Sequence, residues 1–353
     1  MADAAEVARL RLIRTAQIGP VTYRQLVARF GDAAAAIEAL PGLAARGGGR
    51  SPVVALPAVA ERELAAARKL GARHLFIEDA DYPELLAQLD DASPVVMVRG
   101  NVALLARDCV AMVGARNASA AACRFSRQIA AELGRDGITV VSGLARGVDT
   151  AAHVGSIEGG TIGVIAGGID VVYPPENADL QERIAREGLL IAEQPPGIEP
   201  RARHFPHRNR IIAGASLGTL VVEAAPRSGS LITARLAGEM GREVMAVPGS
   251  PLDPRAQGCN GLIQHTLVAL RTRLYRFSQF WAVLCTVTSR SYSPMMPAPQ
   301  ALTATDSNTP VAYCECRRWC RKHKTYGIQG QRRSRFLHKH PNHYTVRLAN
   351  DCH

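Results

Sequence analysis

The sequence predicts an α/β protein in which a small helical module precedes a Rossmann-like, doubly wound and mainly parallel sheet. From residue 109 onwards, short apolar runs alternate with stretches of helical pattern, as in a parallel sheet whose strands are buried on both faces. Gly-containing turns follow several of these runs. Before them, residues 4–70 are rich in Ala, Leu and Arg, with apolar spacing near 3.6. A chain of 353 residues has room for two or three domains.

The helical module is expected to span residues 1–72 and to resemble a helix-hairpin-helix or SAM-like domain. Ile18-Gly19-Pro20 separates two helices, and Phe30-Gly31-Asp32 ends one helix and caps the next. Modules of this kind often contact the DNA backbone. The amphipathic pattern favours packing in a core as the main role of these helices.

The second domain is expected to span residues 73–264. Residues 74–100 lead into it, with a turn at Asp81-Tyr82-Pro83 and a short strand at Val95–Val98. About six further strands are predicted from the apolar runs, at residues 110–113, 138–141, 161–166, 189–192, 219–222 and 243–247. Ligands of such sheets bind at the carboxyl ends of the strands, which is where the Gly-containing turns lie.

Charge and cysteine content divide the chain near residue 264. Residues 1–264 hold 28 basic and 28 acidic residues, whereas residues 265–353 hold 14 basic and 3 acidic ones, so the tail carries the whole net charge of +11. Only Cys109, Cys123 and Cys259 lie before the tail, as in a reduced cytosolic protein without disulfides. No apolar run reaches roughly 18 residues, and no secretory signal is visible. We therefore expect a cytoplasmic protein that does not span a membrane.

The first candidate site is the turn after the first strand of the sheet, at residues 113–119. Gly114 opens the turn, Arg116 would reach a phosphate at the helix N-terminus, and Ser119 would cap the helix or donate to that phosphate. The turn is not a GxGxxG fingerprint, and Ser142 stands where a ribose-binding carboxylate would end the second strand. We expect no dinucleotide and no other cofactor. From this turn alone, a surface arginine beside an ordinary turn is an equally good interpretation.

The second candidate site, residues 142–153, is more specific, and Ser142, Gly143 and Arg146 are its candidate phosphate-binding residues. Gly143 permits close approach of a ligand to the backbone, and Arg146 is a second candidate for phosphate binding. Asp149 would orient that arginine or cap the following helix. His153 lies on an Ala-rich helix, where a structural role is more common than a catalytic one.

The third candidate site is a basic segment followed by a Ser/Gly turn. The segment at residues 205–210 is predicted to be a loop that presents Arg208 and Arg210 to phosphate. Ser228, Gly229 and Ser230 then open a helix whose free N–H groups suit an anion.

Four motifs together resemble the DNA-processing protein A (DprA/Smf) family, and they stand in the family's order. They are residues 114–119, 142–149, 205–212 and 227–234, and residues 173–177 and 247–250 fit as well. The resemblance covers about residues 5–264.

The resemblance implies a protein that binds single-stranded DNA, protects incoming strands during natural transformation and helps to load the RecA recombinase. It also implies a homodimer formed through the Rossmann-like domain. Arg116 and the turn Gly143–Arg146 would line the strand-binding pocket, and Arg208, Arg210, Ser228 and Ser230 would support it. No catalytic residue and no metal are expected.

The tail at residues 265–353 departs from the family pattern. The first 264 residues contain one lysine, Lys69, whereas the tail mixes Lys, His, Cys and aromatic residues without helical or strand period. Our hypothesis is that the tail is disordered or translated out of frame, which the other reading frames of the coding DNA would test. Cys314, Cys316, Cys320 and His323 have irregular spacing for a zinc site, so metal binding is not expected.

Two other functions are compatible with these residues. One is a nucleotide-processing enzyme similar to phosphoribohydrolases, with Glu223 and Arg208 or Arg210 at its centre. The chain lacks the Pro-Gly-Gly-x-Gly-Thr run of those enzymes and has Ala225–Ser230 in its place. Release of free base from AMP, lost in Glu223→Gln, would favour the enzyme. The other is an assembly adaptor that contacts a recombinase and needs DNA only weakly.

Overall fold

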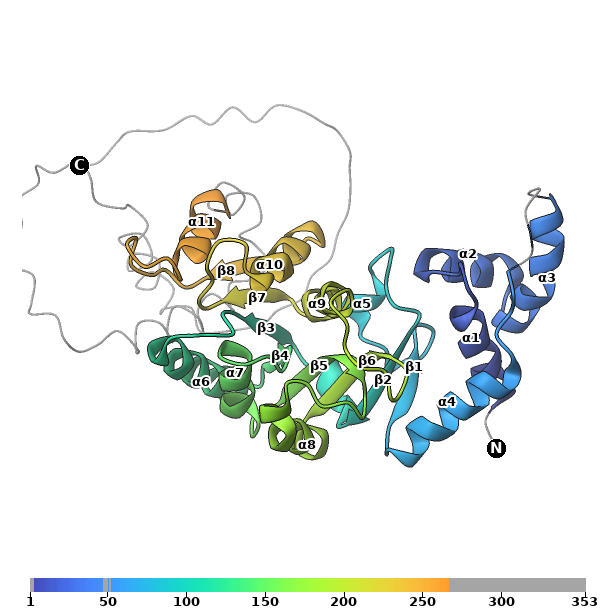
Figure 1. Cartoon of the computed structure of the whole chain (residues 1–353), viewed down its shortest axis with the longest axis horizontal. Coiled ribbons are helices and arrows are strands. Elements are labelled where there is room, and N and C mark those ends of the chain that lie inside the picture. The colour runs from blue at the N-terminus through green and yellow to red at the C-terminus, as the bar shows by residue number, and fades with distance from the viewer. Residues whose placement is uncertain (1–2, 47–49, 51, 267–353) are drawn as a thin grey trace, which may run out of the picture. The chain divides into compact units, whose positions relative to one another are not determined.

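The computed structural model describes residues 3–46, 50 and 52–266 (Figure 1). The predictions about the tail, including its disorder, its reading frame and its cysteines, lie outside these residues. Cys109, Cys123 and Cys259 are free thiols. Within the described ranges, no helix is long and apolar enough to cross a membrane.

Four helices form the N-terminal module. They are α1 (Ala4–Arg14), α2 (Pro20–Phe30), α3 (Ala33–Arg46) and α4 (Pro57–Lys69). Leu12, Tyr23 and Leu40 are buried together in its core. Gly31 ends α2 with a φ of 93°, and the Asp32 side chain accepts a hydrogen bond from the Ala35 N–H at 2.8 Å. The predicted helical module and its two breaks are therefore confirmed.

A single sheet of eight strands follows, in the order β1-β2-β6-β5-β4-β3-β7-β8. The strands are β1 (Arg73–Phe76), β2 (Val95–Gly100), β3 (Cys109–Val113), β4 (Thr139–Ser142), β5 (Thr161–Gly168), β6 (Leu189–Gln194), β7 (Gly218–Val221) and β8 (Glu243–Ala246). Strands β3 to β8 pair in parallel, whereas β2 pairs antiparallel with both of its neighbours, β1 and β6. The mainly parallel sheet agrees with the prediction, which missed β1.

Helices cover both faces of the sheet because alternate strand residues point to opposite faces. On β3, Val110 and Met112 pack with α6 (Ala120–Arg135) and α7 (Val148–Ser156), whereas Ala111 and Val113 pack on the other side. That second face is covered by α9 (His204–Gly214) and α10 (Gly229–Glu239), as Figure 1 shows. The remaining helical segments are α5 (Glu84–Ala87), η1 (Val102–Ala106), η2 (Pro175–Asn177), α8 (Ala178–Glu187) and α11 (Gln257–Thr266).

The predicted basic loop at residues 205–210 is wrong, because these residues belong to helix α9. His204, Arg208, Ile211 and Ile212 are buried at the spacing of a helix face. Two of the charged residues of this segment, Arg208 and Arg210, thus lie in the interior. Because charged residues are usually exposed, these two arginines suggested a solvated loop. The helical spacing of the buried residues in this segment was therefore missed.

Candidate functional site

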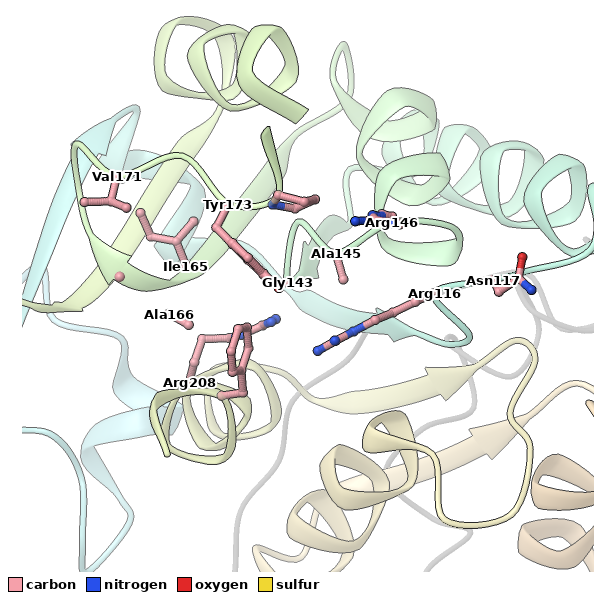
Figure 2. Close-up of a pocket in the computed structure, with 13 residues that line it drawn as sticks. Arg116, Asn117, Gly143, Ala145, Arg146, Ile165, Ala166, Val171, Tyr173 and Arg208 are labelled. Atoms are coloured by element: carbon pink, nitrogen blue, oxygen red, sulfur yellow. The ribbon is translucent and has the colours of Figure 1, made fainter. Parts of the chain in front are cut away.

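A pocket of about 350 Å³ lies at the carboxyl ends of β3, β4 and β5, closed on one side by α9 (Figure 2). Its lining is Arg116, Asn117, Gly143, Ala145, Arg146, Ile165, Ala166, Gly167, Val171, Tyr173, Pro174, Phe205 and Arg208. The turns after three neighbouring parallel strands converge here, as expected for the ligand site of a doubly wound sheet.

Arg208 is the residue of the pocket whose environment is most unusual. Its side chain is buried, at 7% exposure, yet among the described residues it forms no ion pair, and its Nε atom has no hydrogen-bond partner. Burial lowers the pKa of Arg208, the Asp149 carboxylate opposes this, and Arg116 lowers the pKa further. A desolvated cation without a paired anion is costly to the fold. A ligand anion in the pocket would remove that cost.

Gly143 makes room for this guanidinium. A Cβ atom added to Gly143 would lie 1.3 Å from Nη1 of Arg208 and 2.4 Å from its Cζ. The arginine therefore lies directly against the Gly143 backbone, and any side chain at this position would displace it.

Asp149 holds the turn that contains Gly143. Its buried carboxylate accepts hydrogen bonds from the Gly143 N–H at 3.1 Å and the Ala145 N–H at 3.3 Å. Burial raises the pKa of Asp149, while Arg208 and the two N–H donors act in the opposite direction. Asp149 therefore shapes the turn and places a carboxyl group near Arg208.

Two further arginines and two aromatic rings form the open side of the pocket. The exposed Arg116 guanidinium lies 5.4 Å from the Phe205 ring centroid, and Tyr173 and Phe205 have centroids 5.6 Å apart. Arg146 pairs with Glu176 at 3.2 Å, but both side chains are more than half exposed. Such an exposed pair contributes little, so Arg146 remains able to meet a phosphate.

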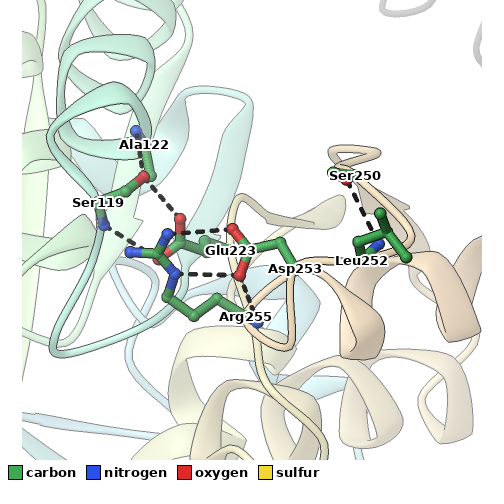
Figure 3. Close-up of polar contacts among 7 residues, drawn as sticks. All are labelled: Ser119, Ala122, Glu223, Ser250, Leu252, Asp253 and Arg255. Atoms are coloured by element: carbon green, nitrogen blue, oxygen red, sulfur yellow. Dashed lines mark hydrogen bonds and ion pairs between the residues drawn. The ribbon is translucent and has the colours of Figure 1, made fainter.

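Ser119, which lies three residues after Arg116, contacts Glu223 (Figure 3). The Glu223 carboxylate accepts hydrogen bonds from the Ser119 N–H at 3.0 Å and from its hydroxyl at 2.7 Å. The Ser119 oxygen in turn accepts from the Ala122 N–H at 3.1 Å, which caps α6. The predicted capping role is confirmed. The Ser119 hydroxyl and Glu223 are engaged with each other, and neither lines the pocket.

Other predicted residues have structural surroundings. The Ser142 hydroxyl donates to the Met112 carbonyl at 2.6 Å. Gly114 faces Val148, since an added Cβ would lie 2.5 Å from that side chain. Ser228 caps α10 and its hydroxyl lies 2.8 Å from that of Ser230. None of these residues, nor Gly229, lines the pocket.

Arg210 points away from the pocket, although Arg208 points into it. Its Nη2 atom lies 2.9 Å from Glu193 and its Nη1 atom lies 3.4 Å from Asp91. Residues two positions apart on a helix point in directions about 200° apart. The helical geometry of α9 therefore separates two arginines that were predicted to contact phosphate together.

His153 has the structural role that its position predicts. It is fully buried, and its Nδ1 atom lies 2.7 Å from the Thr161 hydroxyl. Burial, together with the charge of Arg208, lowers the pKa of His153 to about 3. The ring is therefore neutral at physiological pH.

Acidification is expected to destabilise the fold through His153. In the unfolded chain the His153 ring has its ordinary pKa of 6.5, so it becomes protonated as the pH drops below that value, whereas the ring in the folded protein stays neutral. Protonation therefore stabilises the unfolded state, and the free energy of unfolding falls. About 2 kcal/mol of the free energy of unfolding should disappear between about pH 7 and about pH 5. Urea unfolding of the wild type and of His153→Gln measures this term. Equal pH dependence in the two proteins would contradict it, since His204 and the carboxyl groups contribute alike to both.

The fold and the pocket define an α/β protein with an arginine-lined pocket at the carboxyl ends of its strands. The family of DNA recombination-mediator protein A matches residues 73–278, and the DprA-like N-terminal HHH domain matches residues 3–66. The chain belongs to this family. The match continues past residue 264, the predicted end of the second domain, and the domain bounds remain a prediction.

Individual relatives agree with this assignment. The DNA processing protein DprA of Bacillus subtilis (strain 168) is 43% identical over 212 residues, which cover 59% of this chain and 71% of the relative. That of Streptococcus pneumoniae is 45% identical over 190 residues, 53% of this chain and 67% of the relative. The chain spans about half of the Synechocystis protein Smf, 49% of its length.

Two solved structures share the fold. The X-ray structure of DprA from Streptococcus pneumoniae has a TM-score of 0.56 at 40% identity, covering 60% of this chain and 73% of its own. A structure of DprA from Helicobacter pylori has a TM-score of 0.52 at 25% identity, covering 62% of this chain and 95% of its own. The latter structure is described as revealing the single-stranded DNA binding mode of that protein.

Proposed function

We propose that this chain binds single-stranded DNA in the pocket, as a recombination mediator in natural transformation. A backbone phosphate would sit between Arg208 and Arg116, with Arg146 at the rim. The observation that carries the proposal is Arg208, a buried guanidinium that faces the pocket without an ion-pair partner among the described residues. The planar guanidinium of an arginine can donate two hydrogen bonds to the oxygens of one phosphate, and such contacts are stronger where bulk water is excluded.

The aromatic pair favours a single strand over a duplex. Tyr173 is 47% exposed and lies beside Phe205 at the same pocket. Bases are free to stack on protein rings only when they are unpaired, and each such contact contributes about 1–3 kcal/mol. With only two rings present in this lining, phosphate contacts should supply most of the affinity.

Binding without catalysis is part of the proposal. The enzyme alternative needs Glu223 as a base, but this carboxylate accepts two hydrogen bonds from Ser119 and does not line the pocket. The low pKa of His153 and its burial also argue against a role in proton transfer.

The proposed partners follow from the family. They are single-stranded DNA, the RecA recombinase and a second copy of this chain, which would pair through the Rossmann-like domain in the cytoplasm. Co-sedimentation of RecA with the full chain, with and without an oligonucleotide, would test the recombinase contact separately from DNA binding.

Arg116→Ala is expected to weaken binding of a fluorescent single-stranded oligonucleotide by about tenfold and to reduce the salt dependence by about one phosphate contact. Fluorescence anisotropy against salt measures both, with duplex DNA and AMP as competitors. The matched control is Arg235→Ala, which removes an exposed arginine of α10 outside the pocket. The basic tail is the same in every protein. Equal affinity in the wild type and both variants would contradict the proposed contact of Arg116 with the strand.

A further inference from the structure

We propose that the bound strand continues from the pocket into a second nucleotide position between helices α6 and α7. This inference rests on the proposed function of the pocket. The position is a shallow groove of about 300 Å³, which we call the α6–α7 groove. It is lined by Cys123, Arg127, Arg146, Gly147, Thr150, Ala151 and Asn177.

Continuity with the pocket is the first argument. Arg146 lines both cavities, because it stands at the end of the turn that follows β4 and directly before α7. Figure 2 shows Arg146 beside α7, with Ala145 next to it toward the centre of the pocket. A strand whose phosphate sits near Arg208 and Arg116 can therefore pass over Arg146 into the groove without crossing a buried surface.

The chemistry of the lining is the second argument. The described lining contains two arginines and no carboxylate, so its charge suits a polyanion. Glu176 is the acidic residue that meets Arg146, through an exposed pair that a phosphate can displace. Arg127 is exposed, and among the described residues no carboxylate pairs with it. Its guanidinium is thus available for the next phosphate along the strand.

The floor of the groove has room for a base. Thr150, Ala151 and Cys123 present small side chains there, and Gly147 has none. Helices α6 and α7 are in backbone contact further along, since a Cβ added to Gly155 would lie 2.2 Å from the Arg127 carbonyl oxygen. The groove therefore closes toward Gly155 and opens toward Arg146. An open site of this kind binds weakly alone, but a linked nucleotide held in the pocket raises its effective concentration there.

Oligonucleotides of two lengths test the groove separately from the pocket. For the full chain, Arg127→Ala should weaken binding of an oligothymidylate of about ten nucleotides by about five- to tenfold, and of about two nucleotides by less than about twofold. Arg116→Ala should weaken both. Arg135→Ala, an exposed arginine at the end of the same helix, should weaken neither.

Alkylation of Cys123 gives an independent readout. Cys123 is half-buried in the groove, whereas Cys109 and Cys259 are buried. The longer oligonucleotide should slow the reaction of Cys123 with iodoacetamide, followed on its own peptide by mass spectrometry, and the dinucleotide should not.

Several outcomes would contradict the proposal that the strand continues into the α6–α7 groove. If Arg116→Ala weakens both lengths while Arg127→Ala weakens neither and Cys123 stays unprotected, the pocket stands and the groove is wrong. If Arg203→Ala, an exposed arginine before α9, selectively weakens the longer strand instead, the strand leaves the pocket on the other side. If the wild type binds neither length, the pocket and the groove both fail.

Discussion

Arg208→Met should abolish most single-strand binding, with a loss of about 100-fold, or about 3 kcal/mol. Methionine fills a similar volume without the charge, so the shape of the pocket is kept while its deepest phosphate contact is removed. The effect should exceed that of Arg116→Ala, because Arg208 is buried and Arg116 is exposed, and a charge contact is stronger where water is excluded. Anisotropy titrations at constant salt measure both losses.

The same substitution should leave stability nearly unchanged. Removing an unpaired buried cation relieves a desolvation cost, but it also removes the charge that attracts the Asp149 carboxylate. These terms oppose each other, and we expect the free energy of unfolding to change by about 1 kcal/mol or less. Urea unfolding measures this change.

Arg208→Lys is the informative control for charge alone. A lysine keeps the positive charge but lacks the planar fork, so it should recover part of the affinity and part of the salt dependence. Full binding by Arg208→Met would contradict the proposed phosphate site. A large loss of stability in that variant would instead identify Arg208 as a structural residue.

The sheet was predictable because its strands carry their own signal. Val110–Val113 and Thr161–Ala166 are continuous apolar runs, and such runs fit a parallel sheet covered on both faces. Strand β1 has no such run: Arg73 is exposed, and the strand pairs antiparallel with β2 at the edge of the sheet. β1 forms because it pairs with β2 and packs against α4. Neither contact can be predicted from the residues of β1 alone.

The site was predictable where it lies on turns and unpredictable where it lies on a helix. Arg116, Gly143 and Arg146 follow strands directly, and the carboxyl ends of parallel strands meet at one edge. Arg208 is also in the pocket, but the sequence predicted a loop that presents it together with Arg210. Which of the two faces the pocket depends on the rotation of α9 against the sheet, and this is set by Ile211 and Ile212 in the core.

The pairing of Tyr173 with Phe205 was not foreseen, because the two rings come from segments that converge only in the folded chain. From the sequence, Glu223 was a candidate for the centre of the alternative enzyme site. Its partner is Ser119, 104 residues away in sequence. Such contacts can be inferred only from the order of the strands in the sheet. Glu223 follows β7 and the Arg116 loop follows β3, and these two strands are neighbours.

Gly143→Ala should reduce single-strand affinity by about 30-fold although it adds only one methyl group. The backbone of Gly143 does not have a positive φ, so alanine is compatible with its conformation. The conflict is with Arg208, whose Nη1 atom would lie 1.3 Å from the new Cβ. Because this atom is the far end of a flexible side chain, the guanidinium should move out of the pocket while the fold persists. Gly229→Ala is the matched control, since no atom lies within 4 Å of its added Cβ.

A double-mutant cycle distinguishes displacement of Arg208 from a general distortion of the turn. If Gly143→Ala acts by moving Arg208, then adding it to Arg208→Met should cost almost nothing further, because the group that it displaces is already gone. If the alanine instead disturbs the N–H groups that Asp149 holds, its effect should add fully to that of Arg208→Met. Strong non-additivity in the affinities measured for the two single variants and the double variant would therefore identify Gly143 as the residue that keeps Arg208 in place for the phosphate.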